Sequence, residues 1–199
     1  MIVAKDKAVI DADFFNKITN DGSDTSLFKA VMDELEFEPI MHRYVYDYEL
    51  SANTAARTLV SECYITVEDE SSFWATNATA YRRSFLMLYR TMNSKPYSGG
   101  ADVRNYHRSQ ENLGEIRSSL LAFFNGYNYF MSDDRGAKYY ITNRFPSRHA
   151  IRVMNLYDTF EEIGNRSEHS IKWRDIKGVL KQKLSTKDYE KIRNIWVPQ

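Results

Sequence analysis

The sequence predicts an α/β fold, a three-layer sandwich with a small, mostly parallel central sheet. Short apolar runs rich in β-branched residues alternate with longer segments of helical periodicity, which is typical of a parallel sheet covered by helices. The chain has 199 residues, 43% hydrophobic and 27% charged, which suits one globular domain with a short addition. We assign residues 1–164 to that domain and residues 165–199 to a basic C-terminal helical extension.

The domain is expected to begin with a strand. The run KAVI at residues 7–10 is short and apolar, which predicts a buried strand. Residues 26–37 carry apolar side chains at helical spacing, and Ser26 is suited to cap that helix. A second short strand is expected around Ile40, directly after this helix.

The middle of the chain is expected to be largely helical. A helix that includes Glu49 follows the second strand, and residues 54–94 also have mostly helical character. Residues 94–105 contain proline and two glycines, which predicts a loop. Asn112 then opens another helix, which Asn-Gly ends at Gly126.

Alternating strands and helices close the predicted domain. They are a strand at 129–131, a helical turn at 135–140, a strand at 151–154 and a helix at 156–163. Residues 165–199 depart from this alternation and predict two helices, the second capped by Ser185 or Thr186. In this segment nine basic residues outnumber four acidic ones.

The net charge is zero, but the charge is unevenly distributed. Residues 1–75 carry 15 acids and 6 bases, whereas residues 76–199 carry 12 acids and 21 bases. The asymmetry indicates a basic surface for a polyanion, a basic tail, or an acidic site facing a basic rim; chance is the alternative. One cysteine excludes an internal disulfide, and the absence of a long apolar run predicts no membrane span. We therefore expect a cytoplasmic protein.

Two acidic clusters directly follow predicted strands. Asp11 and Asp13 come after the first strand, and Asp133 and Asp134 come after the strand at 129–131. Neighbouring parallel strands end at the same edge of a sheet, so the two clusters would face one crevice. Close carboxylates repel unless a cation neutralises them, and Mg²⁺ or Mn²⁺ prefers such oxygen ligands. Divalent cations of this kind support phosphodiester hydrolysis.

Each acid also has a structural interpretation. Asp13 and Asp134 are both placed to cap the helix that follows their strand. Asn112 and Glu115 are three residues apart at a predicted helix start, the spacing of a capping box. Glu49 is explained equally well as a charge on a solvated helix face. The joint pattern, two acids after strands and two near helix starts, favours the functional interpretation.

The segments around these acids resemble the PIN-domain family. AVIDADFF is similar to the family's opening strand and places Asp11 in its invariant-acid position. VYDYEL is similar to the second motif, with one extra residue, and offers Glu49. ENLGEI matches a Gly-Glu helix start with Glu115, and YFMSDDRGAK places Ser132 and Asp134 in the last motif. The resemblance covers roughly residues 7–164.

The resemblance implies an endoribonuclease that binds one or two Mg²⁺ or Mn²⁺ ions. It implies catalytic and metal-binding roles for Asp11, Glu49, Glu115 and Asp134, with Asp133 as a further metal-binding neighbour and with Ser132, Arg135 and Asp13 as substrate-binding residues. RNA is the substrate that the family implies. A cognate antitoxin protein and a homodimer are the partners that it implies, because many relatives are toxins of toxin–antitoxin pairs.

Two alternative functions remain open at this stage. Asn112 stands where the family often has Asp, and the extra residue leaves the register at Glu49 open. Both departures favour a catalytically inactive PIN-like scaffold that binds RNA or protein. A DNA-directed nuclease is the other alternative, because related folds cut DNA.

Overall fold

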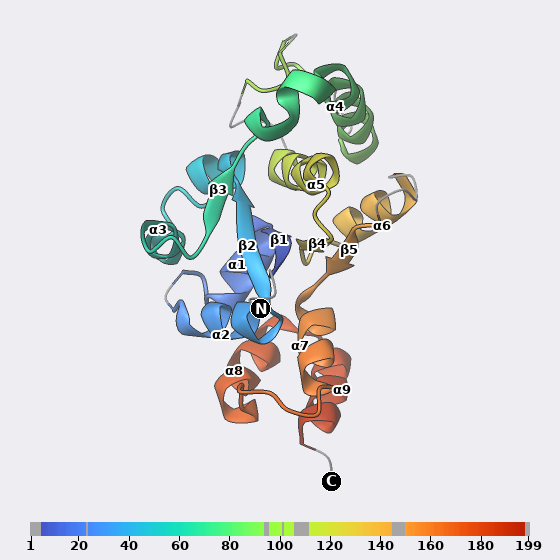
Figure 1. The fold of residues 1–199 in the computed structure, drawn as a ribbon. Helices are drawn as coiled ribbons and strands as arrows, with labels where there is room; N and C mark the ends of the chain where they lie inside the picture. The colour runs from blue at the N-terminus through green and yellow to red at the C-terminus, as the bar shows by residue number, and fades with distance from the viewer. Residues whose placement is uncertain are drawn as a thin grey trace.

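The predicted α/β class is confirmed. The computed structural model describes residues 5–22, 24–93, 96–100, 102–105, 112–144 and 150–197. Within these residues one parallel five-stranded sheet forms, in the order β3-β2-β1-β4-β5 (Figure 1). The strands are β1 (Asp6–Ile10), β2 (Phe37–His42), β3 (Thr66–Glu68), β4 (Tyr129–Met131) and β5 (Arg152–Met154).

Helices cover both faces of the sheet (Figure 1). One face carries α1 (Ala12–Ile18), α2 (Ser26–Glu34), α3 (Thr54–Ser61), α7 (Leu156–Gly164), α8 (Trp173–Lys183) and α9 (Thr186–Trp196). The other face carries α4 (Ser71–Met92), α5 (Leu113–Asn125) and α6 (Arg135–Arg144). A π-helical turn, η1 (Val45–Glu49), follows β2.

Alternation along the strands divides the apolar side chains between two cores. Ala8 and Ile10 of β1 pack with the first group of helices, while Val9 between them packs with the second. Phe130 and Met131 of β4 are divided in the same way. This period of two explains why consecutive residues of β1 and β4 are apolar: both faces of these central strands are buried, as in other parallel sheets.

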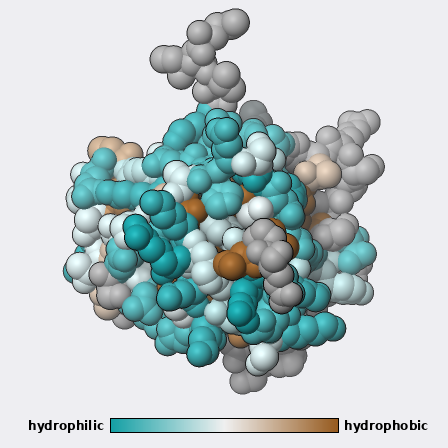
Figure 2. Space-filling model, turned by 90° about the horizontal axis from the view of Figure 1, so that it is seen from below, coloured by the Kyte–Doolittle hydropathy of each residue, from teal (hydrophilic) through white to brown (hydrophobic). Residues whose placement is uncertain are grey.

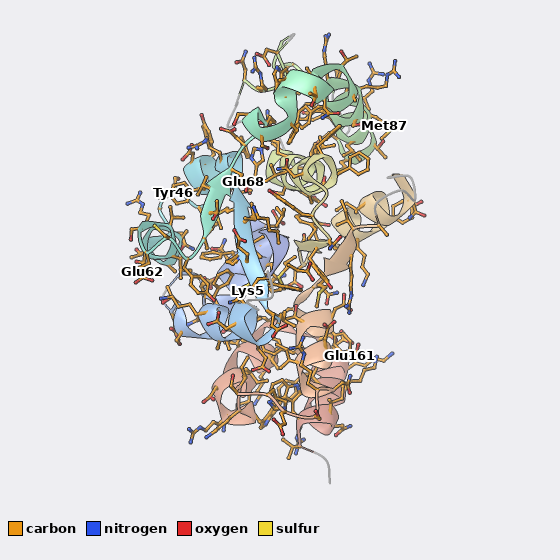
Figure 3. All side chains as sticks on the ribbon, viewed as in Figure 1. Lys5, Tyr46, Glu62, Glu68, Met87 and Glu161 are labelled. Carbon is orange, nitrogen blue, oxygen red and sulfur yellow. The ribbon has the colours of Figure 1, made fainter. Side chains whose placement is uncertain are left out.

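The structure departs from the sequence prediction mainly around β3. Residues 54–94 were expected to be largely helical, but α3 ends at Ser61 and β3 precedes α4. Cys63, with a φ of 57°, makes the turn between them, and Glu68 at the end of β3 is labelled in Figure 3. A strand of three residues is too short for its alternating polar and apolar side chains to be recognised between two helices, so the sequence did not predict β3.

Helix and strand ends account for the other differences. The helix expected over residues 26–37 ends at Glu34, because Phe37 already belongs to β2. Ser26 is its first residue rather than its cap, a position that Thr25 takes. The turn expected at 135–140 continues as α6 to Arg144.

The C-terminal segment forms the two expected helices, and they pack on the domain. Ser185 caps α9, accepting a hydrogen bond from Asp188 N at 3.2 Å. Ile176, Leu180 and Ile192 are fully buried in the same core as α1 and α7. Seen from the end that carries α8 and α9, the surface is mostly hydrophilic (Figure 2). Among the described helices, none has the length and apolar character that a membrane crossing requires.

Candidate functional site

The carboxyl edge of the sheet gathers the acids that the sequence predicted. Asp11 follows β1 and Asp134 follows β4, and these two strands pair in parallel, with Ile10 opposite Met131. Asp11 N donates to Met131 O at 3.0 Å, which continues the pairing one residue beyond β1. The chain order of the sheet reverses between β1 and β4, and open α/β sheets bind ligands at such a point.

Asp11 is the buried centre of the site. Its side chain is only 6% exposed, and Ser132 Oγ donates a hydrogen bond to its Oδ2 at 3.1 Å. Burial raises the pKa of Asp11 to about 6, and the charges of Asp13 and Asp134 act in the same direction. The hydrogen bonds from Ser132 and from Ala12 N oppose this shift without cancelling it.

Glu49 approaches from η1 and lies against the first turn of α5. Its carboxylate accepts a hydrogen bond from Gly114 N, and a Cβ at position 114 would lie 2.3 Å from each carboxylate oxygen. Although the side chain keeps contact with solvent, desolvation and the charge of Asp11 raise the pKa of Glu49 to about 7. The charge of Glu49 also reaches Glu115, so the structure places Glu49 at the site.

Glu115 is the most perturbed of the acids. It is 8% exposed, and its Oε1 has no hydrogen-bond partner among the described residues. Burial raises its pKa to about 8, helped by the charges of Asp134, Asp11 and Glu49. The capping-box interpretation is wrong, because Asn112 has a φ of 59° and its side-chain amide donates to Met92 O instead.

Asp134 joins the site from the segment after β4, where it is exposed. Its Oδ1 accepts from Gly136 N at 2.5 Å, so the capping interpretation is correct as well. Its charge also raises the pKa of Asp11 and of Glu115. Ser132 Oγ accepts from Asp134 N at 3.2 Å while donating to Asp11, which ties the two acids together. The side chain of Arg135 lies outside what the structure describes.

Asp13 and Asp133, the other two acids at this edge, share a lysine as their partner. Lys17 Nζ lies 2.8 Å from Asp13 Oδ2 and 3.0 Å from Asp133 Oδ2. Asp133 Oδ1 also accepts from Leu156 N at 2.7 Å, at the start of α7. Both acids therefore pair with a cation of the chain itself, and Asp133 also contacts the first turn of α7. Lys17 was missed, although its spacing of four from Asp13 indicated the pair.

We call Asp11, Glu49, Glu115 and Asp134 the acid cluster. They come from four segments, and the charges of the other three all raise the pKa of Glu115, which shows that the four share one region. Among the described residues, no three His, Cys, Asp or Glu side chains lie close enough together to hold a metal ion as they stand. Close carboxylates repel unless a cation neutralises them. The oxygen donors and the unpartnered Glu115 Oε1 nevertheless suit a hard divalent cation.

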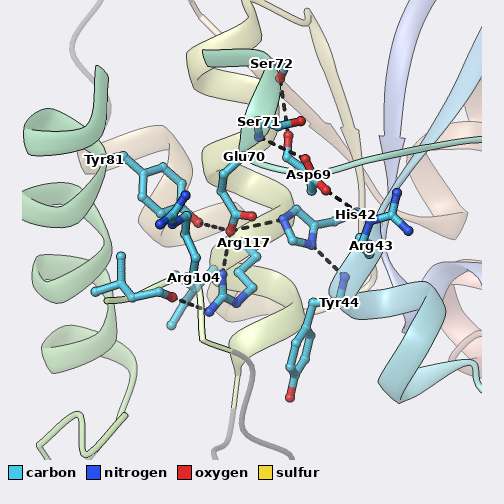
Figure 4. A network of polar contacts seen from close by, with 12 residues as sticks. His42, Arg43, Tyr44, Asp69, Glu70, Ser71, Ser72, Tyr81, Arg104 and Arg117 are labelled. Carbon is cyan, nitrogen blue, oxygen red and sulfur yellow. Dashed lines mark hydrogen bonds and ion pairs between the residues drawn. The ribbon is translucent and has the colours of Figure 1, made fainter. Parts of the chain in front are cut away.

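A buried ionic network supports the site from the side of β2 (Figure 4). Glu70 Oε1 lies 2.5 Å from Arg117 Nη1, 2.7 Å from Tyr81 OH and 3.4 Å from His42 Nε2. These partners lower the pKa of Glu70 despite the opposing effect of burial. Arg117 lies two residues after Glu115 on α5, so the network fixes the helix that presents Glu115. Nothing in the local sequence predicted it.

No known protein assigns a role to these residues by similarity. The chain matches no protein-family model, no curated protein and no solved structure. The PIN-domain resemblance therefore depends on the short motifs of the sequence alone. Any assignment of a function depends on the geometry of the acid cluster.

Proposed function

We propose that this protein is a metal-dependent nuclease of the PIN-domain kind, which hydrolyses RNA phosphodiester bonds at the acid cluster with Mg²⁺ or Mn²⁺. The observation that carries the proposal is Glu115 Oε1, a buried oxygen without a hydrogen-bond partner among the described residues, in a carboxyl group on which the charges of Asp134, Asp11 and Glu49 act. Buried charges without partners are unfavourable in folded proteins. A divalent cation would provide the partner that the described residues do not.

The chain's own residues would hold and orient the reacting groups. Asp11 is fixed by Ser132 Oγ, and Glu49 is fixed by Gly114 N. Asp134 Oδ1 is engaged by Gly136 N, which leaves its other oxygen for a ligand. When bound, the cation supplies charge stabilisation at the phosphoryl oxygen and activates water as a nucleophile. Burial of Asp11 and Glu115 lowers the local dielectric and strengthens their attraction to that cation.

RNA is the substrate in this proposal because the motif resemblance implies it. The excess of 21 bases over 12 acids in residues 76–199 supports a polyanionic substrate. The proposal keeps the further expectations from the resemblance, which are an antitoxin protein as inhibitor, a homodimer and a cytoplasmic location.

Cleavage of a mixed single-stranded RNA pool in Mn²⁺ tests the proposal. We expect Asp11→Asn to lower the cleavage rate at least about 100-fold, since loss of a charged ligand weakens transition-state stabilisation. Asp47→Asn is the matched control, because Asp47 is an exposed acid on η1. It should cleave within about twofold of the wild type. Equal cleavage by the wild type and Asp11→Asn would refute the mechanism.

Calorimetric titration with Mn²⁺ separates the proposal from its alternatives. Binding to the wild type and weakened binding to Asp11→Asn support the proposed site. If the wild type binds no Mn²⁺ even at millimolar concentration, a catalytically inactive scaffold explains the acids better. A parallel cleavage assay on single-stranded DNA distinguishes an RNA-directed from a DNA-directed enzyme.

A further inference from the structure

A cavity of about 380 Å³ lies directly beside the acid cluster. Among the described residues it is lined by Ser132, Asp133, Asp134, Lys138, Tyr139, Asn143 and Asn155. It lies between the carboxyl ends of β4 and β5 and the helix α6. Since Ser132 also contacts Asp11, a ligand in this cavity would be in contact with the proposed site of reaction. The volume is within the range of roughly 300–1,000 Å³ that is usual for small-ligand pockets.

We infer that this cavity receives a nucleobase of a single-stranded nucleic acid, next to the phosphate that the acid cluster acts on. The inference rests on the proposed nuclease function and specifies its substrate class. Three side chains support it: Tyr139 with its aromatic face, and Asn143 and Asn155 with their amides.

Tyr139 provides a stacking surface. It is 64% exposed, the highest value among the large hydrophobic side chains of the described residues. The exposed face of an aromatic ring is a flat apolar surface on which a base can stack. Stacking of a base on such a ring contributes roughly 1–3 kcal/mol and does not depend on the base sequence.

The two amides provide complementary hydrogen-bonding groups. Asn143 Nδ2 donates to Tyr139 O at 2.6 Å, which leaves its carbonyl oxygen as an acceptor. Asn155 Oδ1 accepts from Asp158 N at 2.8 Å, which leaves its amino group as a donor. One donor and one acceptor on a wall are what the edge of a base requires.

The neighbouring charges favour an unpaired strand. Lys138 Nζ lies 2.8 Å from Asp158 Oδ2, and its side chain is 52% exposed at the cavity, so it remains accessible to a phosphate. A base enters such a cavity only after it has left its stack, which is easier in a single strand than in a duplex.

Fluorescence anisotropy with a 5′-labelled 12-nucleotide single-stranded RNA tests the inference. The assay contains EDTA and low salt, so that binding is measured without cleavage. We expect Tyr139→Ala to weaken binding at least about fivefold, because stacking on the ring is lost. Tyr139→Phe keeps the ring and should bind within about twofold of the wild type. A duplex of the same sequence should bind more weakly.

Met87→Ala is the matched control, because Met87 is an exposed apolar side chain on α4, where Figure 3 labels it. It should not change the affinity by more than about twofold. The inference is overturned if Tyr139→Ala binds as the wild type does, if the duplex binds equally well, or if the wild type binds no single strand. If binding depends on Tyr139 but the protein cleaves no RNA, the proposed nuclease function is contradicted, whereas the base-binding cavity is supported.

Discussion

At Gly114, the lack of a side chain makes room for the carboxylate of Glu49. A Cβ there would lie 2.3 Å from both carboxylate oxygens, closer than any real contact. The Gly-Glu pair of the sequence motif thus has a physical meaning: glycine admits one acid of the cluster, and Glu115 after it supplies another.

Replacing Gly114 with alanine should separate metal binding from stability. Alanine favours a helix over glycine by about 1 kcal/mol, which offsets part of the steric clash. We expect the free energy of unfolding of Gly114→Ala to stay within about 1 kcal/mol of the wild-type value, while its affinity for Mn²⁺ falls at least about tenfold. Urea unfolding and calorimetric titration measure the two effects.

Gly178 on α8 offers the matched glycine control. An added Cβ there meets nothing within 4 Å, so Gly178→Ala should leave Mn²⁺ binding unchanged and stabilise the fold by up to about 1 kcal/mol. Unchanged Mn²⁺ affinity in Gly114→Ala would remove Glu49 from the proposed site.

The raised pKa of Glu115 predicts a variant that is more stable than the wild type. Because the pKa rises from 4.5 unfolded to about 8 folded, the native state binds an extra proton between these pH values. The favourable contribution of protonated Glu115 to the free energy of unfolding is fully present below pH 4.5 and is lost as the pH rises through 8. In EDTA at pH 8.5, Glu115→Gln should therefore melt about 2–4 °C above the wild type, equivalent to roughly 1 kcal/mol.

Thermal melts across pH check this expectation. At pH 5 the two proteins should melt together, and Mn²⁺ should raise the Tm of the wild type more than that of Glu115→Gln. Glu62→Gln is the control, because Glu62 is exposed and lies on the other face of the sheet. Its Tm should equal that of the wild type at every pH. If Glu115→Gln is less stable than the wild type at pH 8.5, the negative charge of Glu115 is already neutralised in the folded protein, which contradicts this prediction.

Single residues of the site differ in how well the sequence predicted them. Asp11 and Asp134 were predictable because an acid directly after an apolar strand lies at the carboxyl edge. The approach of Glu49 to Gly114 depends on the path of η1, which no local pattern specifies. The contacts of Asp133 with Lys17 and Leu156 N could not be predicted, because the three residues come from separate segments that only the fold brings together.

Among the elements, α5 is held by the ionic network of Glu70, Arg117, Tyr81 and His42. Glu70 precedes α4, Arg117 belongs to α5 and His42 ends β2, so one carboxylate joins three elements. Glu70 and Arg117 have side-chain exposures of 4% and 0%. Buried charges of this kind are favourable only while every partner is present.

Glu70→Gln should destabilise the protein by roughly 3–5 kcal/mol at pH 7, because Arg117 then keeps a buried charge without its counterion. The partners lower the pKa of Glu70, so its contribution is present above pH 4.5 and is lost as the pH falls through the folded value. The stability difference between wild type and variant should therefore shrink in acid. Urea unfolding at pH 7 and pH 3 measures it.

Glu190→Gln is the surface control for this experiment. Glu190 pairs with Arg193 at 3.2 Å, and both side chains are about half exposed, at 49% and 55%. Exposed pairs contribute less than about 1 kcal/mol. A similar effect of both variants would mean that burial does not strengthen the network.

The elements themselves were largely predictable. Strands β1, β4 and β5 and helices α5 and α7 lie close to where the apolar patterns placed them. Strand β3 was missed, because its three residues gain their order from pairing with β2 rather than from their own sequence.

At the scale of the whole molecule, the C-terminal helices contribute to the same core as the sheet. Trp196 Nε1 donates to Phe160 O at 2.9 Å, and its indole lies against Gly164. Removing this side chain with Trp196→Ala should destabilise the protein by roughly 3 kcal/mol. Urea unfolding followed by circular dichroism measures the loss.

The neighbouring Val197 provides the control. It is 45% exposed, so Val197→Ala should change the free energy of unfolding by less than about 0.5 kcal/mol. If Trp196→Ala were equally mild, α9 would be a peripheral attachment rather than part of the core. The basic composition of residues 165–199 did not reveal this packing, because Lys177, Lys181, Lys187 and Lys191 are exposed while Ile176, Leu180 and Ile192 of the same helices are buried.

The two outermost strands of the sheet, β3 and β5, have three residues each. Unpaired backbone groups at an edge can recruit a strand from another molecule, and the risk grows with strand length. Such short borders leave little backbone for intermolecular pairing. Concentrated solutions of the folded protein should therefore resist fibril formation, even though the inner strands β1 and β4 are rich in apolar residues.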